Sequence, residues 1–223
     1  MSFEGKTILV VGASGVLGAQ ISNILAAGGA RVLGTATSNE SAAKLPSSIA
    51  LGLLLDLQND SSIATLCDYL NSAEMLDGIV LASGRVGFGP SETVSAENTQ
   101  ALMQVNFLGQ ANLVTRLRPA MQSESFVAAI TGVVAERAFP GMAAYCASKS
   151  AMSVWLQASS AEFRKAGIRL LEARPGHTET GLATRPLFGT APQMPLGMEP
   201  NHVATKIVEA ISNGTTVLSS ADF

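Results

Sequence analysis

A tyrosine and a lysine stand four residues apart in the segment Y-C-A-S-K, at Tyr145 and Lys149. On a helix, this spacing brings both side chains to one face. A tyrosine has an ordinary pKa of about 10, and a nearby ammonium group favours its ionised form. The spacing therefore indicates that Tyr145 can serve as a proton donor, with Lys149 as its electrostatic partner.

A glycine-rich turn, G-A-S-G-V-L-G, follows the first apolar run and opens a helical pattern. Glycines in such a turn let the backbone approach a pyrophosphate, and the helix N-terminus supplies N–H groups. The alternative is a purely structural turn, but strand, turn and helix in this order are the context that dinucleotide binding requires. We predict cofactor contacts from Gly12, Ser14, Gly15, Leu17 and Gly18.

The end of the second apolar run, G-T-A-T-S, indicates which dinucleotide would bind. NAD-specific sites carry an acidic residue here for the ribose 2′-hydroxyl, and this chain has none. The hydroxyls of Thr35, Thr37 and Ser38 could instead accept a 2′-phosphate, which favours NADP(H) over NAD(H). After the third run, Asp56 is a candidate for holding the adenine amino group, although it could equally serve as a turn or cap residue. Leu57, which follows it, is a further candidate cofactor contact.

The elements that must position these residues alternate regularly. Continuous apolar runs are separated by helical patterns, of which residues 16–29 are the clearest, and this alternation predicts a doubly wound parallel sheet covered on both faces. A chain of 223 residues suits a single α/β, Rossmann-like domain over residues 1–223. The predicted strands are 7–11, 31–35, 49–55, 77–83, 125–131 and 168–174.

Composition narrows the classes of partner. Charged residues make up 14% of the chain, the net charge is −3 and no Lys/Arg cluster is present, so nucleic acid and anionic membranes are disfavoured. We expect a small-molecule substrate. Cys67 and Cys146 have no metal-ligand spacing and are expected to be free thiols, with no metal site. No leader pattern or run of roughly 20 apolar residues is found, so a cytoplasmic location is expected.

The segment 178–200 breaks the alternation of strands and helices. Prolines, glycines and apolar residues interleave there with neither the helical nor the strand period. An ordered surface loop is one interpretation. We favour a lid over the substrate, because long loops in compact domains are often functional.

Together, these motifs resemble the short-chain dehydrogenase/reductase family over nearly the whole chain, and the N-terminal third resembles its bacterial β-ketoacyl-carrier-protein reductases. The resemblance implies a nicotinamide cofactor and a tetrad of Asn, Ser, Tyr and Lys. Asn106 in V-N-F-L-G matches the asparagine, and Tyr145 and Lys149 match the last two members. The helix that carries them resembles the one that pairs subunits in this family, which implies a homodimer or homotetramer.

Two further segments are expected to contact the cofactor, of which the first resembles the family's pattern and the second departs from it. Pro175 and Thr178, in P-G-H-T-E-T, resemble the segment that meets the nicotinamide. The usual N-N-A-G after the fourth strand is represented here by Leu81 followed by Ala82, Ser83 and Gly84.

The serine of the tetrad is missing, because its position falls on Gly132. Thr131 could replace it, although alternation along a strand should point Thr131 to the opposite face. We therefore expect an NADP(H)-dependent oxidoreductase that interconverts a carbonyl and an alcohol on a small, apolar substrate. The alternative is an NADP(H)-binding protein without turnover, with a regulatory or structural role.

Overall fold

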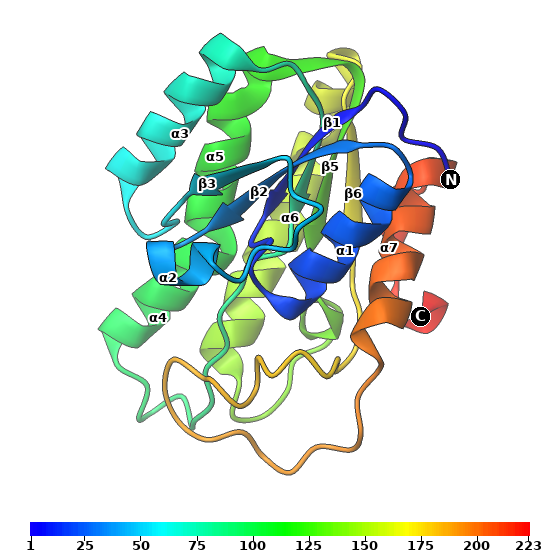
Figure 1. Ribbon diagram of the computed structural model, residues 1–223. Helices are drawn as coiled ribbons and strands as arrows, with labels where there is room; N and C mark the ends of the chain where they lie inside the picture. Colours follow the sequence, from blue (N-terminus) through cyan, green and yellow to red (C-terminus); the bar gives the residue numbers. More distant parts are fainter.

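Seven parallel strands form one sheet in the order β3-β2-β1-β4-β5-β6-β7 (Figure 1). A computed structural model describes residues 1–223. The fold is a single α/β domain of the Rossmann-like, doubly wound class, as the sequence predicts. The strands are β1 (Thr7–Val11), β2 (Arg31–Ala36), β3 (Leu51–Leu54), β4 (Leu76–Leu81), β5 (Met121–Ile130), β6 (Arg169–Ala173) and β7 (Val217–Leu218).

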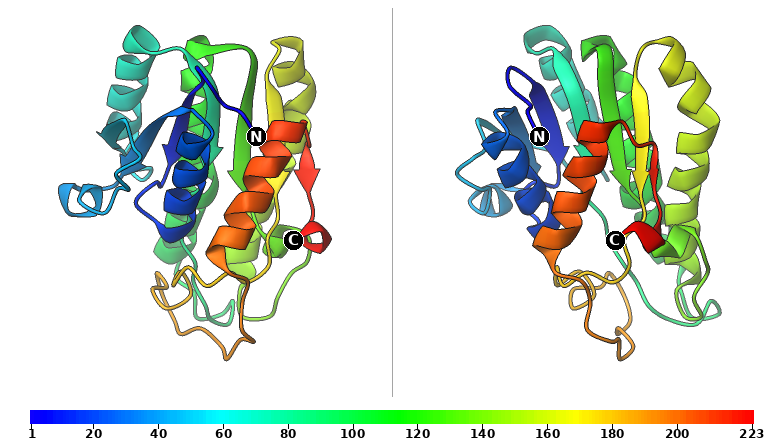
Figure 2. Two further views of the ribbon diagram at one scale, coloured as in Figure 1. Left: turned by 45° about the vertical axis from the view of Figure 1, so that its right-hand side comes forward. Right: turned by 90° about the vertical axis from the view of Figure 1, so that its right-hand side faces the viewer.

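Helices cover both faces of the sheet (Figure 2). One layer holds α1 and α7, which pack against each other, and the opposite layer holds α3, α5 and α6. The α-helices are α1 (Val16–Ala27), α2 (Asn39–Ala42), α3 (Asp60–Ala73), α4 (Ala96–Met103), α5 (Gly109–Leu117), α6 (Ala143–Lys165) and α7 (Pro200–Asn213). A π-helix, η1 (Gln104–Leu108), joins α4 to α5, and short 3-10 turns are η2 (Arg118–Ala120), η3 (Val133–Ala135) and η4 (Ser220–Asp222).

The two faces of the sheet form two separate cores, and β1 contributes to both. Leu9 and Val11 belong to the core under α3, α5 and α6, whereas Ile8 and Val10 belong to the core under α1 and α7. All four side chains are buried. Burial on both faces explains why this strand is continuously apolar in the sequence rather than alternating.

The predicted strands are all present, with shifted ends. β3 begins at Leu51 rather than at residue 49, and β5 begins at Met121, before the predicted residue 125. The helix predicted over 16–29 ends at Ala27, because Gly28 caps it and Gly29 adopts a φ of +95°, which ends helical geometry. The strand β7 was not predicted; it has two residues, too few for its pattern to stand out.

The strand order reverses between β1 and β4, and this reversal positions the site. In doubly wound sheets, the carboxyl ends of the strands at such a point form a crevice for ligands. The turns after β1 and β4 meet there, and the long segment after β6 runs beneath the same edge of the sheet (Figure 1). The predicted cofactor and catalytic residues belong mainly to these turns and to the adjacent helices.

Candidate active site

The turn after β1 depends on its glycines for close packing. Gly12 has a φ of +83°, and a Cβ added there would lie 2.9 Å from the backbone nitrogen of Ser83. A Cβ at Gly18 would overlap the carbonyl oxygen of Gly12. These two glycines let the turn, the helix α1 and the segment after β4 meet without side chains between them.

The N-terminus of α1 has features that favour the binding of an anion. Its N-cap, Gly15, offers no side-chain acceptor, and the first turn carries no acidic residue. Nearby, the Oγ of Ser83 is buried without a hydrogen-bond partner, which is costly unless a ligand or water satisfies it. Free helical N–H groups, a backbone cradle and an unpaired buried hydroxyl all fit a dinucleotide with a pyrophosphate.

The three hydroxyls predicted to bind a 2′-phosphate, at and after the end of β2, have different surroundings. The Thr35 side chain is buried, and its Oγ1 accepts a hydrogen bond of 3.0 Å from the Gly12 N–H, so it joins two strand ends rather than facing a phosphate. Thr37 and Ser38 are exposed, and Ser38 caps α2. The predicted group of phosphate-binding hydroxyls is therefore reduced to Thr37 and Ser38, because the Thr35 side chain is buried against the turn after β1.

The two candidate cofactor contacts after β3, Asp56 and Leu57, also make hydrogen bonds within the protein. Asp56 accepts a hydrogen bond from the Gln58 N–H at 2.9 Å through Oδ1, which is the turn role left open by the sequence. The carbonyl oxygen of Leu57 accepts a hydrogen bond from Gln104 Nε2 at 3.0 Å. That contact ties the turn after β3 to the π-helix η1.

Asn106, in the π-helix η1, is fully buried and makes three hydrogen bonds. Its Oδ1 accepts from the Arg85 N–H at 2.9 Å, and its Nδ2 donates to the Arg85 carbonyl at 2.8 Å and to Ser148 Oγ at 2.9 Å. A π-turn of this kind is frequent at functional sites. The asparagine thus joins the turn after β4 to the first turns of α6.

Lys149 reaches the same place from α6. A Cβ added to Gly84 would lie 3.3 Å from Lys149 Nζ and 3.4 Å from Asn106 Oδ1, so the two polar groups converge on this glycine. Lys149 is buried, and its Nζ donates a hydrogen bond of 2.8 Å to the carbonyl oxygen of Ile130. Burial lowers the pKa of Lys149 to about 8.

Tyr145 begins the same face of α6, one turn before Lys149. Its side chain is buried in an apolar cluster with Val86, Phe88 and Val134. The expectation that Lys149 lowers the pKa of Tyr145 is not met here, because burial dominates and raises that pKa above its ordinary value. Tyr145 is therefore protonated, the form that donates a proton.

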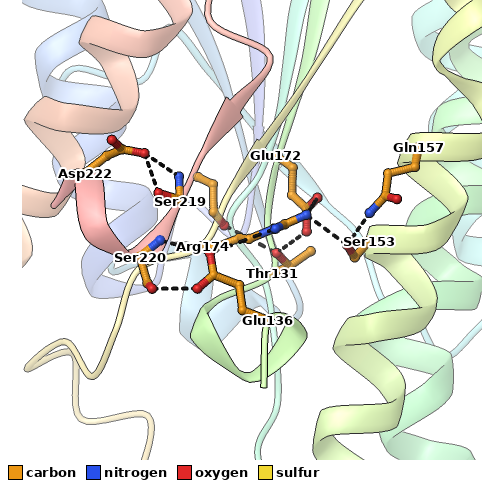
Figure 3. A network of polar contacts seen from close by, with 10 residues as sticks. Thr131, Glu136, Ser153, Gln157, Glu172, Arg174, Ser219, Ser220 and Asp222 are labelled. Carbon is orange, nitrogen blue, oxygen red and sulfur yellow. Dashed lines mark hydrogen bonds and ion pairs between the residues drawn. The ribbon is translucent and has the colours of Figure 1, made fainter. Parts of the chain in front are cut away.

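Gly132, which the sequence places at the serine position, has an unusual backbone conformation. Gly132 has a φ of +94° and a ψ of 167°, a conformation that disfavours any side chain. Thr131 is buried, and its Oγ1 donates a hydrogen bond of 2.7 Å to Glu172 Oε1 (Figure 3). The Thr131 hydroxyl is thus held by a buried carboxylate, which itself pairs with Arg174 at 2.7 Å.

The segment 178–200 contains no helix or strand apart from its last residue, Pro200, which begins α7. A single bridge between Thr178 and Met198 closes it at its base, next to Pro175, whose carbonyl accepts the Val133 N–H at 2.9 Å. Leu187 and Phe188 from its middle pack against the apolar cluster around Tyr145. An open hollow of about 710 Å³ lies within the segment itself and is lined by neither Tyr145 nor Lys149, so it is separate from the site.

Sequence reasoning missed two contributors to this site. Ser148 lies within the Y-C-A-S-K motif, and its position three residues after Tyr145 is the signal that places it near the same helix face. Gly87 gave no signal, because its importance arises only from Phe188, a distant residue that packs against it.

Two other features bear on the class of site. The structure contains no group of three or more His, Cys, Asp or Glu side chains arranged to hold a metal ion. None of its helices combines the length and the apolar character needed to cross a bilayer.

Comparison with known proteins identifies the family. The family model described as short chain dehydrogenase matches residues 6–186. The chain therefore belongs to the short-chain dehydrogenase/reductase family.

Individual relatives agree with this assignment. The chain is 30% identical over 209 residues to the 3-oxoacyl-[acyl-carrier-protein] reductase FabG of Escherichia coli K12, covering 88% of this chain and 85% of FabG. It is 29% identical over 179 residues to the uncharacterized oxidoreductase YbbO of the same organism, covering 78% of this chain but only 66% of YbbO.

Solved structures show the same fold. A short-chain dehydrogenase from Burkholderia cenocepacia J2315, in complex with NADP, superposes with a TM-score of 0.85 at 22% identity, covering 98% of this chain and 89% of the other. BdcA in complex with NADPH superposes with a TM-score of 0.82 at 24% identity, covering 97% and 93%.

Proposed function

We propose that this protein is an NADP(H)-dependent oxidoreductase that interconverts a carbonyl and an alcohol on a small, apolar substrate. One observation carries the proposal. Lys149 Nζ and Asn106 Oδ1 converge on Gly84 at the point where the strand order reverses, with Tyr145 one helical turn away. A binding protein without turnover would have no chemical need for this tyrosine.

The residues around the turn after β1 would hold the cofactor. The N-terminus of α1 and the Ser83 hydroxyl suit the pyrophosphate region, and Thr37 and Ser38 would face a 2′-phosphate. Similar structures contain NADP or NADPH, and one contains NADH. We expect calorimetry to show NADPH binding several-fold tighter than NADH; equal affinities would contradict the assignment.

A nicotinamide cofactor held at this site would supply or accept the hydride for the substrate carbon. Tyr145, protonated in its buried position, donates its proton to the carbonyl oxygen, and the Lys149 ammonium stabilises the tyrosinate that remains. Asn106 keeps the turn after β4 and the helix α6 at a fixed separation. General acid catalysis of this kind contributes roughly 10²–10⁴-fold.

The missing serine reduces this rate without abolishing it. A single donor to a developing oxyanion is worth roughly 10²–10³-fold, which leaves the contribution of Tyr145 in place. Thr131 does not supply that donor in this structure, because its hydroxyl is directed to Glu172.

The surroundings of Tyr145 support an apolar substrate. Apolar side chains from the turn after β4, from η3 and from the segment 178–200 pack in one cluster with it. We propose that this segment is a lid that closes over the substrate, since Leu187 and Phe188 pack against the same cluster. Water excluded by such a lid would strengthen the electrostatic contacts inside the site.

A cofactor-binding protein without turnover remains the second candidate. It is favoured by Gly132, whose backbone conformation disfavours a serine. A screen of apolar aldehydes and ketones for NADPH oxidation, with identification of the alcohol product, separates the two. Turnover supports the oxidoreductase, whereas tight NADPH binding with no turnover on any compound supports the second candidate.

We also propose that two copies pair through the outer face of α6. Val154 and Leu108, on α6 and η1, are large apolar side chains that stay exposed in one copy, at 62% and 45%. Light scattering should show a dimer or tetramer, and Val154→Glu should yield monomers. Met75→Glu, a change at an exposed apolar residue elsewhere, should leave assembly intact; a monomeric parent would contradict the proposal.

A further inference from the structure

Ser148 is fully buried, and its hydroxyl lies between Asn106 of η1 and the first turn of α6. Its Oγ accepts a hydrogen bond of 2.9 Å from Asn106 Nδ2 and donates one of 2.8 Å to the carbonyl oxygen of Tyr145. It is the side chain of α6 that Asn106 contacts by a hydrogen bond. One hydroxyl therefore links the π-helix η1 to the helix turn that carries Tyr145 and Lys149.

Each of these bonds restricts a different motion. The bond to Tyr145 runs back along the first turns of α6, where a serine hydroxyl can adjust the local helix geometry. The bond from Asn106 completes the hydrogen bonding of its Nδ2, whose other acceptor is the Arg85 carbonyl. Without the hydroxyl, the amide of Asn106 would lose one acceptor in a fully buried place and could turn away from Gly84 and Lys149.

We infer that Ser148 is a positioning residue for the reaction, which holds Asn106 in register with Tyr145 and Lys149. The inference rests on the proposed function, because the geometry it protects is that of the proton donor and its cationic partner. A displacement of about 1 Å at a reacting group can cost roughly 100-fold in rate, so a single hydrogen bond at this junction is enough to matter.

The first experiment compares five variants with the parent by steady-state kinetics, with NADPH and the best substrate of the parent. Ser148→Ala should lower kcat by roughly 10- to 100-fold with little change in NADPH affinity. Ser148→Cys keeps the volume but is a weak hydrogen-bonding group, so it should show a similar loss. Ser150→Ala, on the same helix and without a side-chain hydrogen bond, should behave like the parent.

The remaining two variants are Asn106→Ala and the double variant that combines it with Ser148→Ala. If Ser148 acts through Asn106, the double variant should be no slower than Asn106→Ala alone, because the interaction is already lost. Fully additive losses would overturn the inference. So would a Ser148→Ala variant within about twofold of the parent, or a Ser148→Cys variant that retains full activity.

A second measurement needs no turnover and separates this inference from the proposed function. NMR titration of Lys149, in protein without cofactor, should give a midpoint near the lowered pKa of about 8 in the parent. In Ser148→Ala, a loosened Asn106 would admit water, and the midpoint should rise toward the ordinary value. An inactive parent with this rise would refute only the proposed function. An unchanged midpoint would refute the positioning role.

Discussion

Tyr145 and Lys149 lie on one helix face, and burial acts on them in opposite directions. It raises the pKa of the phenol and lowers the pKa of the ammonium, because in each case it disfavours the charged form. The neutral phenol is the form needed to donate a proton. The group that titrates near physiological pH is therefore Lys149, and it is expected to set the pH dependence.

The pH profile of carbonyl reduction tests this assignment. Lys149 is protonated below its pKa of about 8, so kcat should be constant at lower pH and fall as pH rises through that value. The physical reason is that a neutral lysine no longer stabilises the tyrosinate left by proton donation. Lys149→Arg stays charged throughout this range, so its residual activity should not fall near pH 8. The same midpoint in both proteins would show that another group titrates.

The backbone at Gly132 has a conformation that a serine would not readily adopt. At a φ of +94°, any side chain is strained, by about 1–3 kcal/mol. Both Gly132→Ala and Gly132→Ser should therefore lower the free energy of unfolding by a similar amount, measured by urea denaturation. The ratio of kcat/KM between the two variants isolates the hydroxyl, and we expect roughly tenfold in favour of serine. Equal activities would show that the hydroxyl does not reach the substrate.

Among the elements, the proposed lid is attached to the segment after β4 by backbone hydrogen bonds and by close packing at two glycines. The Leu187 N–H donates to the Val86 carbonyl at 2.8 Å, and the Phe88 N–H donates to the Phe188 carbonyl at 3.1 Å. The Phe188 ring occupies the space that a side chain at Gly87 would fill, and Gly189 lies directly against the backbone of Phe88. The closed arrangement therefore depends on the absence of side chains at Gly87 and Gly189.

Gly87→Ala should open this lid while leaving Tyr145 and Lys149 unchanged. The added methyl group would overlap the Phe188 ring and force the two segments apart. We expect limited proteolysis within residues 178–200 to become several-fold faster and KM for the substrate to rise. Adding Phe188→Ala removes the overlap and should restore much of the protease resistance. Resistance equal to the parent in Gly87→Ala would mean that the lid accommodates the methyl group.

At the scale of the whole molecule, the sequence predicts the layers better than the contacts between them. The apolar runs identified six of the seven strands, since burial on both faces leaves a continuous pattern. The Gly-rich turn and the Y-x-x-x-K spacing are formed by residues close together in the chain, so the sequence alone identifies them. The bond from Thr131 to Glu172 and the packing of Phe188 on Gly87 join residues far apart in the chain, and no local pattern encodes them. The pKa of Tyr145 was predicted in the wrong direction for the same reason, because burial arises from the assembled fold.

The most direct test of the account compares the parent with Tyr145→Phe. Turnover of an apolar carbonyl substrate and NADPH affinity, by calorimetry, are measured on both proteins. We predict that Tyr145→Phe lowers kcat by about 100-fold or more and leaves the Kd for NADPH within about threefold, because the phenol supplies the proton while other residues hold the cofactor. Equal kcat values in the two proteins would contradict the account, and so would a parent that binds NADPH tightly and turns over no carbonyl compound.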